Sequence, residues 1–364
     1  MRVLHVIDSL RLGGVEVLLT EMIPRFARHG VESSVAVLKP TDSPLKQRLQ
    51  SLGVPFVPNL YTRIYSPLQV RPLTRCLPDY DLAQSYLFPS QLWLAMAAAR
   101  CGKPVPIVTT EQSTVSRRRK WWYRPVDRWM YRRYSAIACN SQGSADALLR
   151  WLPEVADRVS VVFNGVPLER FQQAQAPPRG EVLPDDGAPV LIFVARMQYE
   201  KDHDTVLRAL AQVPRARLLL VGDGERRPSL EELARSLGVA ERVHFLGRRP
   251  DVDRLLKLAA LYVHSSHYEG FGIAAVEAMA AGLPIIASDV PGLSEVVGSA
   301  GLLFPQGDAG ALARHLNAVL ASDDLRQKLA RASQQRAQEF SIERTVQSYL
   351  DIYRKVTAAA GRTS

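Results

Sequence analysis

Two glutamates in the second half of the chain, Glu269 and Glu277, have the type and spacing of a ligand-binding pair. They lie eight residues apart in the run 268–284, which is typical of a loop followed by a helix that stops at Gly282. The helical neighbours of Glu277 at three and four positions are apolar, so its carboxylate is expected in an enclosed face. A carboxylate there needs hydrogen-bond donors, and a ligand diol would supply two.

Glu269 is expected at the entrance of that helix, where its carboxylate would accept hydrogen bonds from sugar hydroxyls. Backbone amides of Phe271, Gly272 and Ile273 would face a diphosphate at the helix N-terminus. The alternative is that Glu269 is only an acid at a helix entrance and that Glu277 pairs with a buried arginine. We favour the ligand interpretation, because this motif and two others all follow strands.

Two cations, Arg196 and Lys201, follow the strand expected at 189–195. Ligands of open α/β sheets bind outside the carboxyl ends of the strands, so both side chains are expected at a cleft. Together they would neutralise a leaving diphosphate without a metal ion. The alternative is a surface ion pair with Glu200 or Asp202, which would contribute little to stability.

A glycine pair, Gly13 and Gly14, follows the first expected strand and precedes a helix, with Glu16 just inside it. Such a turn lets backbone amides approach an anion, and a diphosphate is the expected guest. The alternative is an ordinary turn that needs glycine only for its dihedral angles. The run is not the GxGxxG dinucleotide fingerprint, which weakens a hydride-transfer function.

These motifs need parallel sheets to position them, and short β-branched runs do alternate with helical patterns along the chain. The expected strands are 3–8, 33–38, 82–86, 105–110 and 135–140 in the first half, and 189–195, 217–222, 243–247, 261–266 and 284–288 in the second. This order predicts an α/β fold with two doubly wound, Rossmann-like domains, at 1–170 and 190–341. The segment 171–189, rich in Pro, Gly and charge, is expected to be a linker. The final helix, within 342–364, is expected to pack back on the first domain.

Composition agrees with a globular chain. Hydrophobic residues make up 47% and charged residues 23%, which excludes a disordered tail. No apolar run approaches the length that spans a bilayer, and the start has no apolar signal region, so we expect a cytoplasmic protein. The three cysteines stand far apart, which suggests neither a zinc site nor disulfides.

The net charge of +10 comes from the first part of the chain. Residues 1–165 hold 22 Lys and Arg against 12 Asp and Glu, whereas residues 166–364 hold 24 of each kind. Much of the excess lies in one segment, Arg117, Arg118, Arg119 and Lys120, which is followed by Trp121 and Trp122. Basic groups beside such aromatic side chains favour an anionic membrane surface.

The alternative for this segment is a solvated basic helix with Val126, Met130 and Ile137 facing a core. Nucleic acid stands third, because no known nucleic-acid-binding signature accompanies the charge, and we expect none as a partner.

Taken together, the motifs resemble those of retaining glycosyltransferases of family 4, also called glycosyltransferases group 1. The similarity rests on EGFGIAAVEAMAAGLPIIAS (269–288), ARMQYEKD (195–202), VGDGE (221–225), RVHFLGRRPDV (242–252) and VPGLSEVV (290–297), with GGVE (13–16) and NGV (164–166) in the first half. It implies the GT-B architecture, in which two Rossmann-like domains face a central cleft.

The resemblance also implies a role for each matching residue. Glu269 would lie beside the donor sugar, and Arg196 and Lys201 would grip the donor diphosphate. Glu277 would bind the ribose, and Gly14 would approach the diphosphate from the first domain. The remaining donor-binding residues it implies are Gly247, Arg248, Phe271, Gly272, Ile273, Leu293, Ser294 and Glu295. Glu16 and the segment 117–122 would lie on the acceptor or membrane side.

One position departs from the family pattern. Many members have a histidine soon after the strand at 105–110, where this chain has Gln112, and glutamine cannot act as a base. His5, His264 and His267 stand elsewhere and do not restore the pattern.

The resemblance implies a metal-independent transfer from a UDP- or GDP-sugar, with no cofactor, to an acceptor hydroxyl. A lipid-linked or membrane-surface glycan would suit the basic segment, as in cell-envelope polysaccharide or glycolipid synthesis by a peripheral enzyme on the inner face of the membrane. Two alternatives remain: a nucleotide-sugar epimerase of the same architecture, and a non-catalytic protein that only binds a nucleotide sugar.

Overall fold

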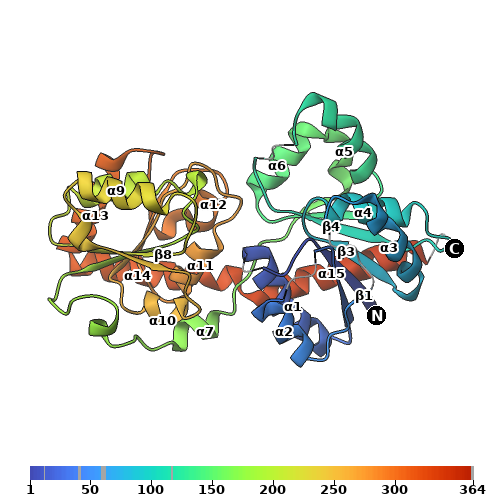
Figure 1. The fold of residues 1–364 in the computed structure, drawn as a ribbon, viewed down its shortest axis with the longest axis horizontal. Helices are drawn as coiled ribbons and strands as arrows, with labels where there is room; N and C mark the ends of the chain where they lie inside the picture. The colour runs from blue at the N-terminus through green and yellow to red at the C-terminus, as the bar shows by residue number, and fades with distance from the viewer. Residues whose placement is uncertain (12, 40–41, 59–62, 116–117, 362–364) are drawn as a thin grey trace. The chain divides into compact units, whose positions relative to one another are not determined.

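The computed structural model describes residues 1–11, 13–39, 42–58, 63–115 and 118–361. These residues form two compact units. The N-terminal unit contains residues 1–165 together with the end of the chain from Ile342, and the C-terminal unit contains Val166–Ser341. Figure 1 shows a central sheet with helices on its faces in each unit.

The sheet of the N-terminal unit has six parallel strands in the order β2-β1-β3-β4-β5-β6. Its strands are β1 (Arg2–Ile7), β2 (Glu32–Val37), β3 (Leu82–Ser85), β4 (Ile107–Glu111), β5 (Ala136–Cys139) and β6 (Val159–Val161). Successive residues of β1 alternate between two cores: Val3 and Ile7 belong to one, Leu4 and Val6 to the other. Both faces are therefore covered, as a parallel sheet requires.

Two groups of helices cover the faces of this sheet. Apolar residues of α1 (Gly14–Arg28), α2 (Pro44–Ser51) and α15 (Ile342–Ala360) build one core. Those of α3 (Val70–Cys76), α4 (Ser90–Ala98), α5 (Arg124–Tyr131) and α6 (Gln142–Trp151) build the other. The last helix α15 therefore belongs to the N-terminal unit, where Tyr353 packs 5.6 Å from the Phe26 ring of α1.

The sheet of the C-terminal unit also has six parallel strands, in the order β12-β11-β10-β7-β8-β9. Its strands are β7 (Val190–Val194), β8 (Arg217–Val221), β9 (Val243–Gly247), β10 (Leu261–His264), β11 (Ile285–Ser288) and β12 (Leu302–Phe304). Its helices are α7 (Leu168–Gln173), α8 (His203–Leu210), α9 (Arg227–Ser236), α10 (Val252–Leu256), α11 (Ile273–Ala280), α12 (Leu293–Val297), α13 (Ala309–Ala321) and α14 (Asp323–Ala337). The predicted fold class, two doubly wound parallel sheets, is confirmed.

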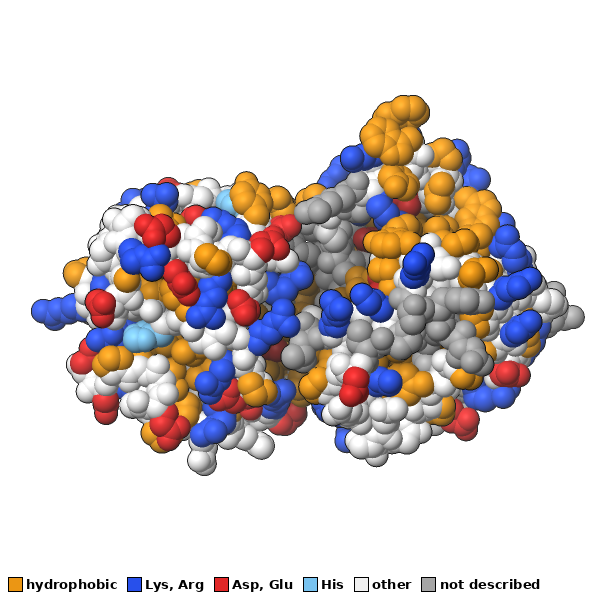
Figure 2. Space-filling model, in the orientation of Figure 1, with side chains coloured by type: hydrophobic (Ala, Val, Ile, Leu, Met, Phe, Trp, Pro, Cys, Tyr) orange, Lys and Arg blue, Asp and Glu red, His pale blue; other side chains and the backbone are white. Residues whose placement is uncertain are grey.

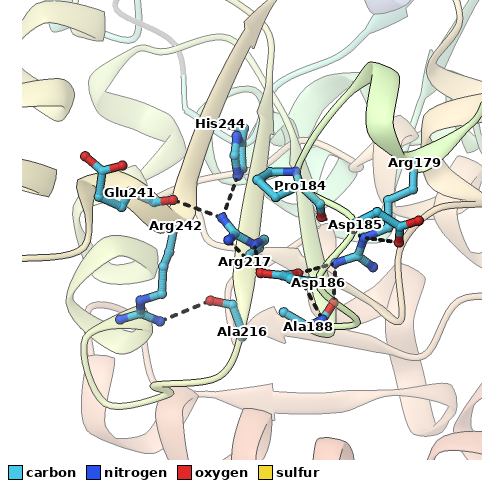
Figure 3. Close-up of polar contacts among 10 residues, drawn as sticks. All are labelled: Arg179, Pro184, Asp185, Asp186, Ala188, Ala216, Arg217, Glu241, Arg242 and His244. Atoms are coloured by element: carbon cyan, nitrogen blue, oxygen red, sulfur yellow. Dashed lines mark hydrogen bonds and ion pairs between the residues drawn. The ribbon is translucent and has the colours of Figure 1, made fainter.

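The segment expected to be a linker, 171–189, lies inside the C-terminal unit. Arg179 donates hydrogen bonds to the carbonyl oxygen of Ala188 (2.7 Å) and to the Asp186 carboxylate (3.1 Å). The other oxygen of Asp186 pairs with Arg217 of β8 at 2.6 Å, as Figure 3 shows. These bonds pin the segment to the sheet, so its Pro and Gly content reflects an irregular path rather than a free linker.

Two short edge strands were not predicted, β6 and β12. Each has only three residues, which is shorter than the runs of four to eight residues that mark a strand in a sequence. No helix in the described part of the chain is long and apolar enough to cross a membrane.

Candidate active site

The sheet order of the C-terminal unit locates its ligand-binding edge. The chain runs from β7 outward to β8 and β9, then returns to β10 on the other side of β7 and continues outward to β12. The connections therefore leave β7 and β10 in opposite directions, and the carboxyl ends of these two strands open a crevice. The turns after these two strands carry Arg196, Lys201 and Glu269.

The turn after β7 is shaped by a close approach from β8. A Cβ atom on Gly222 would lie 2.0 Å from the carbonyl oxygen of Ala195, so only glycine fits there. The Ala195 amide also donates to Val221 O at 2.9 Å. This support fixes the backbone at Arg196, whose side chain is exposed and makes no hydrogen bond or ion pair with any residue that the structure describes.

Lys201 and Glu269 form an ion pair, and both side chains are largely buried, with exposed fractions of 19% and 14%. The Glu269 carboxylate also accepts from the backbone amide of Gly270 (3.2 Å) and lies 3.2 Å from Nε2 of His264. Burial opposes ionisation of Glu269, but Lys201 and His264 outweigh it and lower its pKa below the usual value. Glu269 is therefore ionised at neutral pH.

The loop after Glu269 packs against the start of α12. A Cβ on Gly292 would lie 2.6 Å from the carbonyl oxygens of both Glu269 and Gly270, so this contact also requires glycine. As a result Leu293, Ser294 and Glu295 begin α12 beside the Glu269 loop. Leu293 and Phe271 are buried, whereas Ser294 and Glu295 are half buried.

Helix α11 begins at this loop, with Gly272 as its N-cap residue and Ile273 as its first helical residue. Its amide groups at the start point out of the helix, which gives the site a partial positive charge beside the ion pair. The structure thus places Glu269, Lys201 and the residues 271–273 and 293–295 close together.

Glu277 lies on α11, about one turn from its start, and is partly buried. Burial raises its pKa to about 7, Arg170 lowers it and Asp253 raises it. Arg170 belongs to α7 and forms an ion pair with Asp253 at 3.1 Å. Arg170 was not predicted, because it directly precedes the segment 171–189 that was interpreted as a linker, and nothing in the sequence pattern placed it near α11.

The remaining predicted donor residues, Gly247 and Arg248, lie at the end of β9. Gly247 accepts a hydrogen bond from the Gly222 amide at 2.8 Å, which joins this strand end to the turn of β8. Arg248 is exposed.

In the N-terminal unit, Gly14 is exposed and starts α1 after the N-cap residue Gly13. The Glu16 carboxylate folds back over this helix start: a Cβ on Gly13 would lie 2.4 Å from one of its oxygens. An acid in this position interacts favourably with the free amides of the first turn.

At the carboxyl end of β4, Gln112 is part of a cluster of amide side chains. Its Oε1 accepts from Nδ2 of Asn140 (3.0 Å) and from Nδ2 of Asn164 (2.9 Å). Both asparagines are nearly fully buried, and their Oδ1 atoms have no hydrogen-bond partner among the described residues. Sequence analysis noted Gln112 but missed the two asparagines, which only the ends of β5 and β6 bring to it.

In the basic segment before α5, two arginines bond to other residues of the protein and two tryptophans are exposed. Arg118 pairs with the buried Asp127 (3.1 Å), and Arg119 donates to Thr114 O (3.0 Å), so both are half buried. Trp121 and Trp122 are 79% and 52% exposed. Arg117 lies outside the described residues.

Two parallel rows of side chains, here called stripes, run along helix α5 and the residues just before and after it. Arg124, Arg128 and Arg132 recur every four residues on one stripe, and Trp121, Pro125 and Trp129 on the next. They line an open groove of about 570 Å³. Figure 2 shows hydrophobic side chains projecting from this part of the N-terminal unit with Lys and Arg beside them.

The alternative of a solvated basic helix expected three side chains to face a core. Met130 and Ile137 are buried, but Val126 is 41% exposed.

Metal-ligating side chains do not gather in the described part of the chain: no group of three His, Cys, Asp or Glu residues there could hold an ion.

Comparison with known proteins gives the family. The family model described as glycosyl transferases group 1 matches residues 178–336, and the model described as glycosyltransferase family 4 matches residues 12–170. The chain belongs to the group 1 glycosyltransferase family. The first match spans the Lys201–Glu269 pair and the second spans the amide cluster, so both units carry the family pattern.

Two relatives within this family show how far the similarity extends. The chain is 35% identical over 241 residues to a D-inositol 3-phosphate glycosyltransferase of Saccharomonospora viridis, covering 61% of this chain and 56% of the relative. It is 32% identical over 227 residues to the lipopolysaccharide core biosynthesis glycosyltransferase LpsE of Rhizobium meliloti, covering 61% and 65%. The chain thus spans little more than half the length of the curated relatives it matches.

Among solved structures, the Anabaena protein HepE in complex with UDP-glucose is similar over 98% of this chain and all of its own, with a TM-score of 0.84 and 25% identity. This similarity confirms the GT-B type of fold for the two Rossmann-like sheets.

Proposed function

We propose that this chain transfers a sugar from a nucleoside-diphosphate sugar to an acceptor hydroxyl, with retention of the anomeric configuration and without a metal ion. The observation that carries this function is the Lys201–Glu269 ion pair at the switch point between β7 and β10, beside the start of α11. Its support outside the chain is the family itself and HepE, which was crystallised with UDP-glucose.

The residues at this edge take distinct roles in the reaction. Arg196 and Lys201 neutralise the diphosphate as it leaves, and the amides of residues 271–273 add the partial charge of a helix start. Glu269 lies beside the donor sugar, and Glu277 accepts hydrogen bonds from the ribose. Gly14, Gly247, Arg248 and residues 293–295 complete the donor-binding set.

In the reaction, the bond between the anomeric carbon and the phosphate oxygen breaks while the acceptor oxygen bonds to the same face of that carbon. The acceptor proton passes to the leaving phosphate, so no side chain has to act as a base. Gln112, which cannot take a proton, is compatible with this route. Exclusion of water keeps the sugar from being hydrolysed instead.

The acceptor in this proposal is a lipid-linked or membrane-surface glycan of a cell-envelope polysaccharide or glycolipid. Support comes from α5, where a stripe of guanidinium groups runs beside a stripe formed by two tryptophans and a proline. Among the described residues that line the groove, the one acid is Glu154, which pairs with Arg128 at 2.6 Å. The surplus of cations suits lipid phosphates, and the exposed indoles suit the membrane interface. The protein would then be cytoplasmic and bind the inner face of the membrane.

Vesicle binding tests the membrane part. We expect the protein to sediment with vesicles of phosphatidylcholine and phosphatidylglycerol but not with phosphatidylcholine alone. The double variant Trp121→Ser with Trp122→Ser should lose at least about tenfold in affinity. Tyr65→Ser, which removes another exposed aromatic of the same unit, is the matched control and should bind normally. Equal binding to both vesicle types, or binding to RNA but not to vesicles, would refute the membrane surface.

Nucleotide release tests the reaction. The purified protein is incubated with UDP-, GDP- and ADP-sugars in EDTA, with and without a membrane lipid extract, and the released nucleoside diphosphate is measured. We expect release from one donor, stimulated by the extract, and a product with the anomeric configuration of the donor by NMR. Release that requires a divalent cation, or a product of inverted configuration, would contradict the corresponding part of the proposal.

Substitution of Glu269 distinguishes sugar transfer from the two alternatives, an epimerase and a non-catalytic nucleotide-sugar-binding protein. Glu269→Gln should lower turnover by about a thousandfold and change nucleotide affinity by less than about threefold. The control is Glu241→Gln, which alters an exposed glutamate beyond β8 and should leave turnover unchanged (Figure 3). An epimerised donor without diphosphate release would favour the epimerase, and nucleotide binding without any turnover would favour the non-catalytic protein.

A further inference from the structure

Strand β10 ends directly beneath the ion pair, in His264, whose side chain is 2% exposed. Its Nε2 lies 3.2 Å from Oε2 of Glu269, and its Nδ1 lies 3.2 Å from the hydroxyl of Tyr262. The Tyr262 hydroxyl is itself 3.5 Å from Val194 O at the end of β7. A chain of polar groups therefore connects the two strands of the switch point to Glu269.

The proton positions in this chain follow from what each partner can do. Ionised Glu269 only accepts hydrogen bonds, so Nε2 of His264 must carry a proton. Burial lowers the pKa of His264, which leaves the ring neutral with one N–H. Nδ1 is then the acceptor for the Tyr262 hydroxyl, and the ring is held as the Nε2–H tautomer.

The next residue, Ser265, makes a second link. Its hydroxyl donates to Oδ2 of Asp202 at 2.8 Å. Asp202 follows Lys201 and has a φ of 35°, a left-handed backbone that is strained for a residue other than glycine. The same carboxylate caps α8 through the Thr205 amide (3.4 Å). The hydroxyl of Ser265 thus helps to hold the turn that presents Lys201.

We infer that the end of β10 positions both charged groups of the site: His264 orients Glu269, and Ser265 orients the turn that carries Lys201. This inference rests on the proposed function. When the Lys201 ammonium moves to the diphosphate of a donor, Glu269 loses that partner, and the bonds from His264 and from the Gly270 amide keep its carboxylate in place. A displacement of about 1 Å in such a group lowers the rate by about a hundredfold.

Two substitutions of His264 test the hydrogen bond. Phenylalanine fills the space but donates nothing, whereas glutamine restores an N–H donor. We expect His264→Phe to lower kcat by about 10- to 100-fold with the donor KM changed less than about threefold, and His264→Gln to recover most of the loss. His244→Gln is the control, because His244 lies beside Arg217 and away from the ion pair (Figure 3). Equal losses in the two His264 variants would overturn the inference.

A matched serine pair tests the second link. Ser265→Ala should lower kcat by about tenfold, whereas Ser266→Ala should change it less than about twofold, since the Ser266 hydroxyl has no partner among the described residues. The same effect from both substitutions would show that Ser265 only packs.

Nitrogen NMR tests the inference without any turnover. In ¹⁵N-histidine-labelled protein, the His264 signals are identified by their loss in His264→Gln. They should show a neutral Nε2–H tautomer from pH 7 to 8. In Glu269→Ala, the Nε2–H of His264 should exchange faster with water. An Nδ1–H tautomer, or a ring that titrates in this range, would overturn the positioning role. If the spectra are as expected but the protein transfers no sugar, only the proposed function is refuted.

Discussion

At the carboxyl edge of the C-terminal sheet, β7 and β10 lead to an ion pair, Lys201 with Glu269, that is mostly buried. At the same edge of the N-terminal sheet, β4 leads to Gln112, a neutral side chain hydrogen-bonded to Asn140 and Asn164. The two sheets share strand number and parallel direction but differ in strand order, and the side chains compared here differ in charge.

The charged pair at the C-terminal edge and the neutral amides beside Gln112 suit different kinds of ligand. Buried ions are costly unless opposite charges surround them, so an edge that keeps them is suited to a ligand that brings charge of its own, such as a diphosphate. Amides carry no such cost once hydrogen-bonded, and their free oxygens suit neutral hydroxyls. The C-terminal edge is thus the one that we propose for the donor.

The largest effect is expected from Lys201→Ala. It leaves the Glu269 carboxylate largely buried without its cation, which should lower the free energy of unfolding by about 3 kcal/mol at pH 7. Since the folded-state pKa of Glu269 is lowered, the stability from this pair is present above its ordinary pKa and is lost as pH falls through the folded value. In Lys201→Ala the buried carboxyl has lost its cation and can bind a proton at pH 4, which relieves the cost. Denaturant titrations at pH 7 and pH 4 should therefore show a smaller difference between variant and wild type at the lower pH. An equal difference at both would contradict the ionised pair.

Gln112→Leu tests the neutral edge. It removes the acceptor of two buried amides, which should lower the free energy of unfolding by about 2 kcal/mol, as measured by denaturant titration. Turnover should fall less than about tenfold, because no charge is lost. A loss of turnover as large as that of Glu269→Gln would remove the distinction between the two edges.

The pH dependence of stability at Glu277 gives a further test of the C-terminal edge. Its pKa is raised to about 7 by burial, with Arg170 opposing, so its contribution to stability is full below its ordinary pKa of 4.5 and falls as pH rises through 7. Glu277→Gln removes this dependence. Calorimetry should show the variant melting about 2–4 °C above wild type at pH 8 and at the same temperature at pH 5. A variant that melts lower at pH 8 would show that the carboxylate is stabilised by a cation instead.

The smallest effect is expected away from both edges. Asp186→Asn removes ion pairs with Arg179 and Arg217 that are open to solvent (Figure 3). The melting temperature should stay within about 1 °C of wild type in calorimetry. A drop comparable to that of Lys201→Ala would mean that the segment 171–189, rather than the active-site pair, limits the stability of the C-terminal unit.

Sequence patterns located the strands of four residues or more and missed β6 and β12, because an edge strand of three residues is too short to show a period. They misassigned the segment 171–189 because composition reports irregular backbone but not packing. The bonds of Arg179 and Asp186 are visible only in three dimensions.

In the site, Glu269 and Lys201 were predictable because each stands at a strand end in a spaced motif. The role inferred for His264 could not be predicted, although the residue is present in the sequence. Whether its ring meets Glu269 depends on which face of β10 it occupies and on the path of the following loop, and neither is encoded in spacing alone. Arg170 was missed for the same reason.

The most direct test of the donor edge is hydrogen–deuterium exchange in the presence of UDP, GDP or ADP. We predict that one of the three slows exchange most at residues 195–202 and 269–277, with little change at residues 107–115. Slowing that is greatest at 107–115, or no slowing with any of the three nucleotides, would contradict the assignment of the donor to the C-terminal edge.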